Sequence, residues 1–484
     1  WGCLFCFKEK GKIMGAKRKK RYIVRVGDFE VPLIKTDRSY PQFDNAILDL
    51  GRQTAKMKEM LERPELVTHH QFLPVVLREK IFLKMHFDDK AKRLKLDKKI
   101  RPIVEVAHSD SVIFSLYAAM LNKYYEQRVA DIGIKEVATA YRRGRGSNIE
   151  ASKEVIDQVF LTKQCWIIKS DFVGFFDNLN HQLIKQRVLD LAGGYKCKLP
   201  ADWYAVLHAL TKYRDIHADA IPDEMLSYAK KHNRYIQRVR DLDGAIKTGK
   251  IQVSKKHEIG IPQGTSMSAV LANVYMIPFD HAMKTLAQSY GGIYRRYSDD
   301  FVLLIPKAVS RSSIRTVIRD INVMAQRLSR LQLEKKKTKV LLYTKAKESV
   351  VKLSEELELS PSVFDYLGFV FDGRCVTIRA KGLFKFSHKS RHSVRQVAFG
   401  QNQLIKGNNM IYIPYQEAYH RLTGQYLNMS EEAQTFRGYA SKADKIYKTN
   451  NPGYGVKIDD QARKVVKKSQ LYLNERRKEY AQWR

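Results

Sequence analysis

The segment Ile293–Ile305 reads IYRRYSDDFVLLI and places two acidic residues, Asp299 and Asp300, inside an otherwise apolar and aromatic stretch. The apolar residues on either side predict two strands joined by a Ser-Asp-Asp turn. Adjacent carboxylates repel each other and resist ionisation unless a cation neutralises them. The pattern therefore favours a divalent metal site over an ordinary solvated turn, in which aspartate is also common.

A third carboxylate follows a second apolar strand. Cys165–Lys169 (CWIIK) runs towards Asp171, within the longer segment KSDFVGFFDNLNH. A carboxylate at a strand end can meet the tip of a neighbouring hairpin, and three carboxylates from two strands can hold a pair of Mg²⁺ ions for phosphoryl transfer. We therefore predict Asp171, Asp299 and Asp300 as the catalytic and metal-binding residues, with Mn²⁺ as the alternative ion.

A glycine-rich loop lies between these two segments in the sequence. Gly260–Asn273 reads GIPQGTSMSAVLAN, which predicts a tight loop that opens a helix. Such a loop can lie flat against a nucleotide or a template base. An ordinary loop that leads into a helix capped by Ser or Thr would have the same sequence. The loop therefore indicates a nucleotide site only together with the segments around it.

In this order the three segments resemble the palm of a reverse transcriptase. Asp171 and Phe176 are similar to the first palm motif of that family, Pro262–Gly264 (PQG) to the second, and Tyr297–Asp300 (YSDD) to its Y-x-D-D box. Four more segments are similar to its fingers segment, the Y/F-R-x-G-R-S segment of the bacterial lineage, the lysine-bearing fourth motif and the primer grip: Lys99–Pro102 (KIRP), Tyr141–Ser147 (YRRGRGS), Leu333–Thr338 (LEKKKT) and Tyr366–Phe369 (YLGF). The resemblance covers residues 95–375.

The resemblance implies an α+β fold, a right-hand polymerase with fingers, a ferredoxin-like palm with helices on one face of its sheet, and a helical thumb. The expected division is an N-terminal extension over residues 1–85, fingers over 86–165 interleaved with the palm, the palm over 166–374 with a helical insertion near 200–258, and a basic, tyrosine-rich helical thumb and C-terminal region over 375–484. No motif indicates a role for residues 1–60.

The resemblance also implies roles for individual residues. The nucleotide-binding set comprises Lys99 and Arg101 for phosphate oxygens, the Phe172 backbone for the triphosphate, Phe176 against the sugar, Gln263 for template or nucleotide, and Lys337 as proton donor to pyrophosphate. Neighbouring lysines leave two of these choices open, since Lys98 could replace Lys99, and Lys335 or Lys336 could replace Lys337. The expected nucleic-acid contacts are Arg142, Arg145, Tyr366 and Gly368.

The charge of the chain agrees with a nucleic-acid partner. There are 87 Lys and Arg against 51 Asp and Glu, a net charge of +36. Such a surplus repels itself unless a polyanion is near, and neutralising phosphates releases counterions and drives binding. Hydrophobic residues make up 44% of the chain, which excludes a mainly disordered protein. Five scattered cysteines predict a reducing, cytoplasmic location, and no apolar run is long enough to predict a membrane span.

The implied activity is RNA-directed DNA polymerase, which makes cDNA from dNTPs on an RNA template. Two departures narrow the lineage: Thr265 follows PQG where group II intron proteins usually carry glycine, and Val376–Ile378 (VTI) stands where retron enzymes read Val-Thr-Gly. What remains resembles the unassigned and defence-associated, abortive-infection type reverse transcriptases. That resemblance implies a cognate non-coding RNA as template or scaffold, in bacterial anti-phage defence.

Two other functions stay open at this stage. An RNA-dependent RNA polymerase shares the palm, but such enzymes typically place an acid where Phe176 stands. A non-catalytic RNA-binding protein with a relic palm would not need all three carboxylates, and all three are present. The primer, whether RNA, DNA or a protein tyrosine, is left open, and a homo-oligomer is compatible with the sequence.

Overall fold

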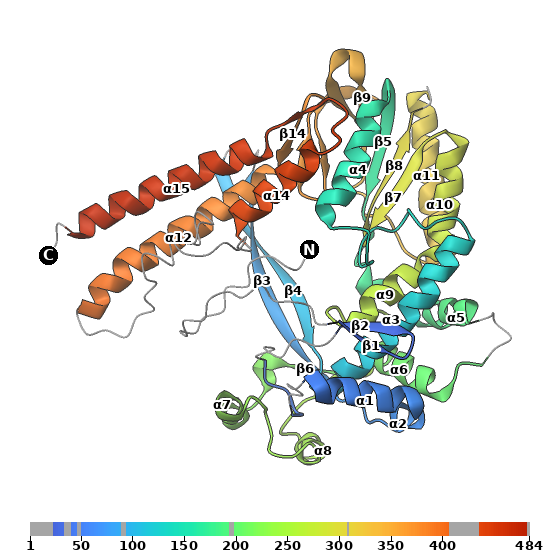
Figure 1. The fold of residues 1–484 in the computed structure, drawn as a ribbon, viewed down its shortest axis with the longest axis vertical. Helices are drawn as coiled ribbons and strands as arrows, with labels where there is room; N and C mark the ends of the chain where they lie inside the picture. The colour runs from blue at the N-terminus through green and yellow to red at the C-terminus, as the bar shows by residue number, and fades with distance from the viewer. Residues whose placement is uncertain are drawn as a thin grey trace.

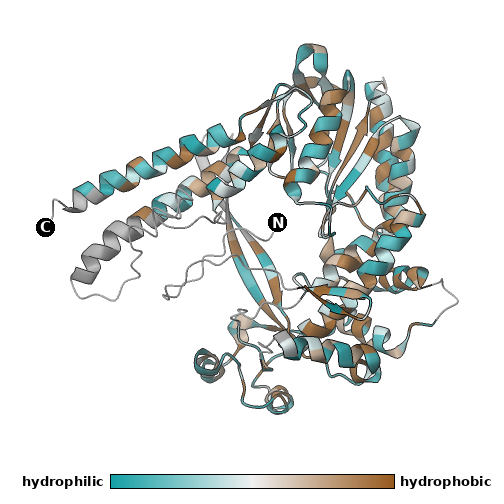
Figure 2. Cartoon of the chain, in the orientation of Figure 1, coloured by the Kyte–Doolittle hydropathy of each residue, from teal (hydrophilic) through white to brown (hydrophobic). Residues whose placement is uncertain are grey.

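The computed structural model describes residues 23–32, 40–45, 50–88, 93–192, 198–306, 309–405 and 435–481. A sheet backed by helices carries a long two-stranded ribbon on one side, and a pair of C-terminal helices extends away from it (Figure 1). The apolar residues gather on the strands of the large sheet and on the helices that cover it, whereas the last helix of the chain, one of the extended pair, is mostly hydrophilic (Figure 2). The architecture is α+β, as predicted.

The central sheet has six strands in the order β11-β10-β9-β5-β8-β7. Their bounds are β5 Gln164–Ser170, β7 Ile293–Tyr297, β8 Asp300–Ile305, β9 Lys339–Thr344, β10 Ser349–Leu353 and β11 Leu359–Ser362. Each neighbouring pair is antiparallel. Strand β8 therefore lies between β5 and β7, which run in the same direction, and this split βαβ arrangement is the ferredoxin-like palm that the resemblance implied.

Both faces of this sheet are buried. Trp166, Ile168 and Leu303 belong to a core built with α3, α9, α10 and α11, whereas Ile167 and Leu304 point into a second core with α4 and α14. The covering helices are α3 His108–Asp131, α4 Asn148–Leu161, α9 Ser266–Tyr275, α10 Ile277–Ser289, α11 Arg311–Ser329 and α14 Phe436–Lys448. The expectation of helices on one face only is wrong, and the continuous apolar run of β8 follows from its two buried faces.

A small second sheet completes the cover of the second face. Its strands are β12 Phe364–Tyr366, β13 Phe369–Phe371, β14 Cys375–Ile378 and β15 Gly455–Val456. Within the segment that resembles the primer grip, the chain turns at Leu367 and Gly368, both with positive φ, and β12 pairs back onto β13. Glycine adopts such angles without strain, which explains why the turn falls there.

The fingers side is built around a long ribbon that the sequence analysis did not predict. Strands β3 (Val75–Asp88) and β4 (Arg93–Glu105) pair along their whole length, and the short strand β6 (Asp215–His217) joins only the first three residues of β3. Residues before the ribbon form β1 Ile23–Val26, β2 Phe29–Pro32, α1 Leu50–Glu62 and α2 Glu65–Thr68. Val26, Val31, Met57 and Val67 pack into the main core, so these residues are part of the body of the protein.

Residues 200–258, predicted as a helical insertion, form three α-helices, one short strand and a 3-10 turn. These elements are α6 Ala201–Thr211, β6, η2 Ala218–Ala220, α7 Asp223–His232 and α8 Asp241–Lys247, and α5 (His181–Leu191) precedes them. A third, smaller core around Ile216, Tyr235 and Leu242 holds this part together. The remaining 3-10 turns are η1 Phe176–Asn178 and η3 Lys345–Lys347.

The C-terminal region is mainly helical in its described part. Helices α12 (Ala380–Ile405) and α15 (Ile458–Ala481) run side by side away from the sheet, and α14 packs at their base (Figure 1). Tyr447 and Tyr454 are buried in the second core, so these two tyrosines serve packing. Four other tyrosines of the predicted tyrosine-rich region lie outside the described residues: Tyr412, Tyr415, Tyr419 and Tyr426. No helix within the described ranges is both long and apolar enough to cross a membrane.

Candidate active site

Asp171 stands directly after β5, the strand predicted to carry it. The register of β5 and β8 ends at Ser170 opposite Phe301, so the next position brings Asp171 beside Asp300. The Asp171 carbonyl accepts a hydrogen bond from the Glu334 N–H at 2.7 Å, which ties the strand end to the segment that carries Lys337. Asp171 is buried, and its backbone is fixed by the sheet on one side and by this segment on the other.

Asp299 and Asp300 lie at the tip of the β7–β8 hairpin, as predicted. Tyr297 pairs with Asp300, so Ser298 and Asp299 form a two-residue turn. Ser298 has φ +60°, and a positive φ at the first turn position suits the right-handed twist of a hairpin. The turn projects Asp299 from the end of the sheet, while Asp300 already belongs to β8 and is buried.

The three carboxylates converge closely enough to perturb one another. Burial, followed by the negative charges of Asp171 and Asp300, raises the pKa of Asp299 to about 6. Burial also raises the pKa of Asp300, although the nearby Lys169 ammonium opposes the shift. Burial and the repulsion between carboxylates both oppose the ionisation of Asp299 and Asp300, and a bound cation would favour it.

One cation of the chain already reaches this group. The Lys337 ammonium forms an ion pair with Asp171 Oδ2, whereas Lys335 and Lys336 are exposed neighbours for which no such contact is found in the described structure. Burial acts to lower the pKa of Lys337, but the hydrogen bond to Asp171 and the charges of the three carboxylates raise it overall. Of the three lysines that the sequence left open, Lys337 is thus the one at the carboxylates.

The donor set fits a divalent cation. Asp171 Oδ1 is buried without a hydrogen-bond partner among the described groups, and carboxylate oxygens are the ligands that Mg²⁺ prefers. Within the described ranges, however, no three acidic, histidine or cysteine side chains are spaced as a finished metal site. The Lys337 ammonium neutralises part of the charge that an ion would otherwise compensate.

The Gly260–Gly264 loop lies against the segment that follows Asp171. The Ile261 N–H donates to the Phe176 carbonyl at 2.9 Å, and Gln263 Nε2 donates to Asp177 Oδ1 at 3.2 Å. A Cβ atom at Gly260 would lie 2.6 Å from the Asp177 carbonyl oxygen, so only glycine allows this approach. Phe176 is half-buried and packs edge-on against Phe175, which leaves part of its ring open.

The remaining predicted nucleotide contacts lie on different elements. Phe172 packs among Phe175, Phe279 and Phe301 in the core, so only its backbone is available to a ligand. Arg101 is half-buried on β4, with its guanidinium 5.5 Å from the Phe82 ring centre. Lys99 pairs with Phe82 in the ribbon, and its side chain lies outside the described part. The base of β4 does reach the loop, because the Val104 N–H donates to the Gln263 carbonyl at 3.3 Å.

Two of the residues predicted to contact nucleic acid, Arg142 and Tyr366, are buried and therefore not available for such contacts. The Arg142 side chain is buried, pairs with Glu126 and donates to the Lys135 and Ala138 carbonyls, so it holds its own loop in place. The Tyr366 ring is fully buried in the second core and offers no surface to a strand.

The other two predicted contacts remain accessible in part. Arg145 is half-buried and donates to the Glu136 carbonyl at 2.7 Å. Gly368, at the tip of the β12–β13 turn, has open space around its Cα.

A buried ion pair beneath the Ser298–Asp299 turn was missed by the sequence analysis. Arg296 is fully buried and donates to both Asp280 oxygens, at 2.8 and 2.7 Å, and to the Ser298 carbonyl at 2.9 Å. Arg296 shares the inward face of β7 with Tyr294, so a charged residue at an alternating core position was the available signal. The pair holds the turn from which Asp299 projects.

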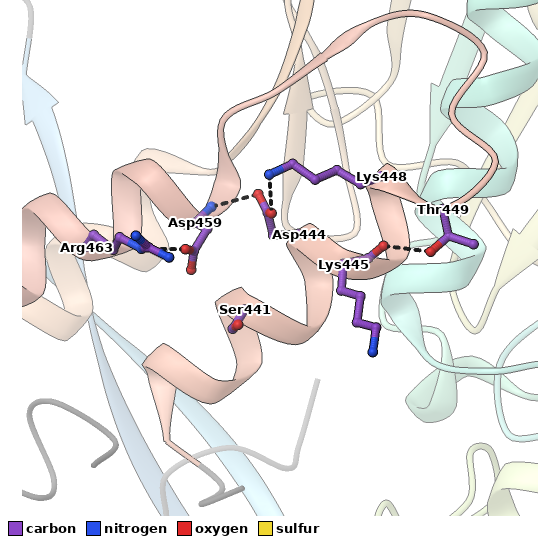
Figure 3. Close-up of a pocket in the computed structure, with 7 residues that line it drawn as sticks. All are labelled: Ser441, Asp444, Lys445, Lys448, Thr449, Asp459 and Arg463. Atoms are coloured by element: carbon purple, nitrogen blue, oxygen red, sulfur yellow. Dashed lines mark hydrogen bonds and ion pairs between the residues drawn. The ribbon is translucent and has the colours of Figure 1, made fainter.

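A cavity lies apart from the carboxylates, on α14 and α15. It measures about 440 Å³ and is lined by Ser441, Asp444, Lys445, Lys448, Thr449, Asp459 and Arg463. Its charged groups pair with one another, Asp444 with Lys448 and Asp459 with Arg463 (Figure 3). These pairs stabilise the base of the C-terminal helices, and nothing at this cavity resembles the catalytic group.

The sequence of this chain matches the profile of a known protein family. The profile of the family "Reverse transcriptase (RNA-dependent DNA polymerase)" matches residues 92–371, more than half of the chain and the whole of the carboxylate group. No curated protein sequence matches.

Among solved structures, 410 chains match this one. Apo telomerase from Candida tropicalis, truncated from its C-terminal domain, is 12% identical over 61% of this chain, with a TM-score of 0.36. Telomerase from Candida albicans in complex with a fragment of telomeric RNA is 10% identical over 86% of this chain and 68% of its own length, with a TM-score of 0.38.

The RNA-dependent RNA polymerase of a human picobirnavirus is 12% identical over 62% of this chain and 43% of its own, with a TM-score of 0.32. The chain spans about half (53%) of the Candida tropicalis protein. Similarities this distant carry no argument about function.

Proposed function

The chain belongs to the reverse transcriptase (RNA-dependent DNA polymerase) family, and from that premise we propose that it synthesises DNA from dNTPs on an RNA template. The observation that supports this most directly is the convergence of Asp171, Asp299 and Asp300, in which a buried Asp171 oxygen lacks a partner among the described groups. A family member that no longer catalysed would have no reason to keep three mutually repelling carboxylates.

Asp171, Asp299 and Asp300 would hold two divalent ions, Mg²⁺ in the first instance. When bound, such ions lower the pKa of the attacking 3′-hydroxyl and stabilise charge on the phosphates. Lys337 already lies at Asp171, where it can exchange the carboxylate for a phosphate oxygen and supply a proton to the leaving pyrophosphate. Arg296 and Asp280 act as positioning residues, since they touch the turn and not the substrate.

The incoming nucleotide would lie between the loop and the ribbon. Gln263 and Phe176 come from two segments that are hydrogen-bonded to each other, and β4, which carries Lys99 and Arg101, joins the same loop through Val104. Arg101 would bind phosphate oxygens in bidentate fashion. The open part of the Phe176 ring would exclude a 2′-hydroxyl, which favours DNA over RNA synthesis.

We further propose a dedicated RNA partner and a role in anti-phage defence. The defence role rests on the resemblance to the defence-associated enzymes. The RNA partner is supported by composition: residues 375–484 carry 21 Lys and Arg against 8 Asp and Glu, and nine of the 26 tyrosines. Such a composition suits binding to a phosphate backbone and to stacked bases. The burial of Tyr447 and Tyr454 limits this idea to the other tyrosines, since packed rings are not available to bases.

The activity is tested with the purified full chain, a primed RNA template, labelled dNTPs and Mg²⁺. We expect extension with dNTPs, little extension with rNTPs, and none from a variant with both Asp299→Ala and Asp300→Ala. Extension with rNTPs as efficient as with dNTPs would show an RNA polymerase instead. Sequencing the RNA that copurifies tests the dedicated partner, because a random sample of cellular RNA would contradict it.

A further inference from the structure

Tyr141 has an unusual backbone and an unusual place for a tyrosine of the palm. Its φ is +62°, a left-handed conformation that bulky L-residues rarely adopt. Its hydroxyl donates to the Ser298 Oγ at 3.3 Å, so the side chain meets the turn that carries Asp299. The residue is nevertheless 48% exposed. Strain of this kind persists only where the surroundings impose it, and it gathers at functional sites.

The surroundings of Tyr141 do impose it. On one side, the Thr139 N–H donates to the Arg296 carbonyl at 2.8 Å, and Asn273 Nδ2 donates to the Ala140 carbonyl at 3.0 Å. On the other side, the buried Arg142 is fixed by Glu126. The backbone of Tyr141 is thus held between two anchored neighbours, which connect to α9 and α3, and the ring is held through its hydroxyl at Ser298.

The Tyr141 side chain lies beside the turn that carries the aspartates. Its hydroxyl is hydrogen-bonded to Ser298, which directly precedes Asp299 in the two-residue turn. The rings of Phe172 and Tyr294 near this turn are fully buried, as packing residues are. A rigid aromatic ring left half open next to the reacting carboxylates has the properties of a stacking platform.

The side from which Tyr141 approaches indicates which nucleotide it meets. The incoming nucleotide belongs with Phe176, Gln263 and β4. The loop that starts at Tyr141 instead continues to Asn148, which donates to the Leu367 carbonyl and to the Tyr439 hydroxyl of α14, each at 3.0 Å. The loop that starts at Tyr141 therefore leads to α14 and the base of the C-terminal helices, and we infer that an extended strand would leave the site on this side.

We propose that Tyr141 contacts the substrate: its ring stacks on the 3′-terminal nucleotide of the primer, while its hydroxyl, held by Ser298, keeps that nucleotide in register with Asp299. The assignment rests on the proposed polymerase function. Stacking on an aromatic face is tolerant of all four bases, as a primer terminus requires. The hydroxyl sets the position of the ring, and the ring provides the contact.

The test uses the full chain bound to an RNA template and a DNA primer that ends in 2-aminopurine, without metal or dNTP, so that no turnover is needed. Fluorescence of the terminal base should be quenched by wild type and by Tyr141→Phe, and much less by Tyr141→Ala. Tyr141→Gly should behave like Tyr141→Ala and should not lower the melting temperature, since glycine accepts φ +62° without strain. The matched control is Tyr124→Ala, a tyrosine on α3 that is 47% exposed.

In primer extension, Tyr141→Ala and Tyr141→Gly should lower kcat/KM for the primer by about tenfold or more, with the KM for dNTP unchanged. Unaltered quenching in both variants would overturn the proposal. So would an equal loss in Tyr141→Phe, which would show that the hydroxyl merely positions the turn. A wild-type chain that quenches the terminal base but never extends it would instead contradict the polymerase function.

Discussion

Two antiparallel hairpins of this protein have the same local structure and opposite surroundings. In β7–β8 the strands are 5 and 6 residues long, and every residue of β8 is buried. In β3–β4 the strands are 14 and 13 residues long, a third strand pairs with only three residues of β3, and Ile81 and Ile100, which face each other, are 57% and 50% exposed. The palm hairpin carries the aspartates, and the ribbon carries Lys99 and Arg101.

The difference suits two requirements of the proposed catalysis. Carboxylates that would hold ions need a fixed geometry, and the sheet, the Arg296–Asp280 pair and the tight turn supply it. A cationic side chain that binds the phosphates of an incoming nucleotide has to extend to the nucleotide, and its position need not be fixed as tightly. A ribbon that projects from the body of the protein can present such a side chain. Between them, the Gly260–Gly264 loop contacts both sides, through Asp177 and Val104.

The largest effect is expected at the tip of the palm hairpin. Replacing Asp299 and Asp300 by Ala should lower dNTP incorporation by about 10⁴-fold or more, since removing a single electrostatic interaction at a reacting centre typically costs about 10²–10³-fold in rate. Circular dichroism should show an intact fold, and Asp219→Ala, at an exposed position on η2, is the control. Incorporation within about tenfold of wild type would mean that the chemistry lies elsewhere.

The second effect concerns what holds that tip. Asp280→Ala leaves the Arg296 guanidinium buried without its partner, and breaking such a pair should lower the free energy of unfolding by about 3–5 kcal/mol. The exposed pair Arg238–Asp241 serves as the control, because Asp241→Ala should cost at most about 1 kcal/mol. Urea unfolding measures both. Equal small effects would show that the turn does not depend on the buried pair.

The sequence was informative where the local pattern and the surroundings agreed. The apolar residues on either side of the Ser-Asp-Asp turn predicted β7 and β8, and the apolar run before Asp171 predicted β5, because burial of both sheet faces leaves continuous apolar runs in β5 and β8. The ribbon was missed although its apolar residues also alternate, at Ile81, Leu83, Met85 and Phe87, since the many lysines and arginines along residues 78–101 made the segment look like a solvated surface.

The sequence did not predict which polar side chains are buried, because the local pattern of residues does not determine this. Arg142 was predicted to contact nucleic acid, yet its partner Glu126 lies 16 residues earlier, on α3. The burial of Arg296 on β7 depends in the same way on a distant partner, since Asp280 lies on α10. Tyr366 was placed at a surface motif, whereas the turn at Leu367 folds its strand into the second core. Such contacts depend on tertiary structure, and a motif names the segment without stating which side chain faces inward.

A third prediction concerns the junction between the two hairpins. Phe176→Ala removes the half-open ring beside the loop, so the ratio of rNTP to dNTP incorporation should rise by about 10–200-fold, the range for steric discrimination in a pocket. Single-nucleotide incorporation measures the ratio. Phe384→Ala, at an exposed phenylalanine of α12, should leave it unchanged. An unchanged ratio of rNTP to dNTP incorporation in the Phe176→Ala variant would show that the ring serves packing only.

A fourth prediction tests the ribbon itself. Arg101→Ala should raise the KM for dNTP by about tenfold, the size of one charge-assisted hydrogen bond, with little change in stability. Lys98→Ala is the control, because Lys98 lies three positions away on β4 and thus on the opposite face, and it is also exposed. If both variants raised the KM equally, the ribbon would act through its total charge and not through one face.

The smallest effect is expected on the outer face of the ribbon, and its size decides whether this face stays open in solution. Ile81→Thr and Ile100→Thr should each change the free energy of unfolding by no more than about 0.5 kcal/mol, the usual range for exposed positions. Leu303→Ala, in the buried strand β8, should lower it by about 2–5 kcal/mol. Urea unfolding of the three variants at several protein concentrations measures the contrast. A loss above about 1 kcal/mol at Ile100, growing with protein concentration, would show that a second copy of the chain covers this face, because exposed isoleucines gain stability only from a partner that buries them.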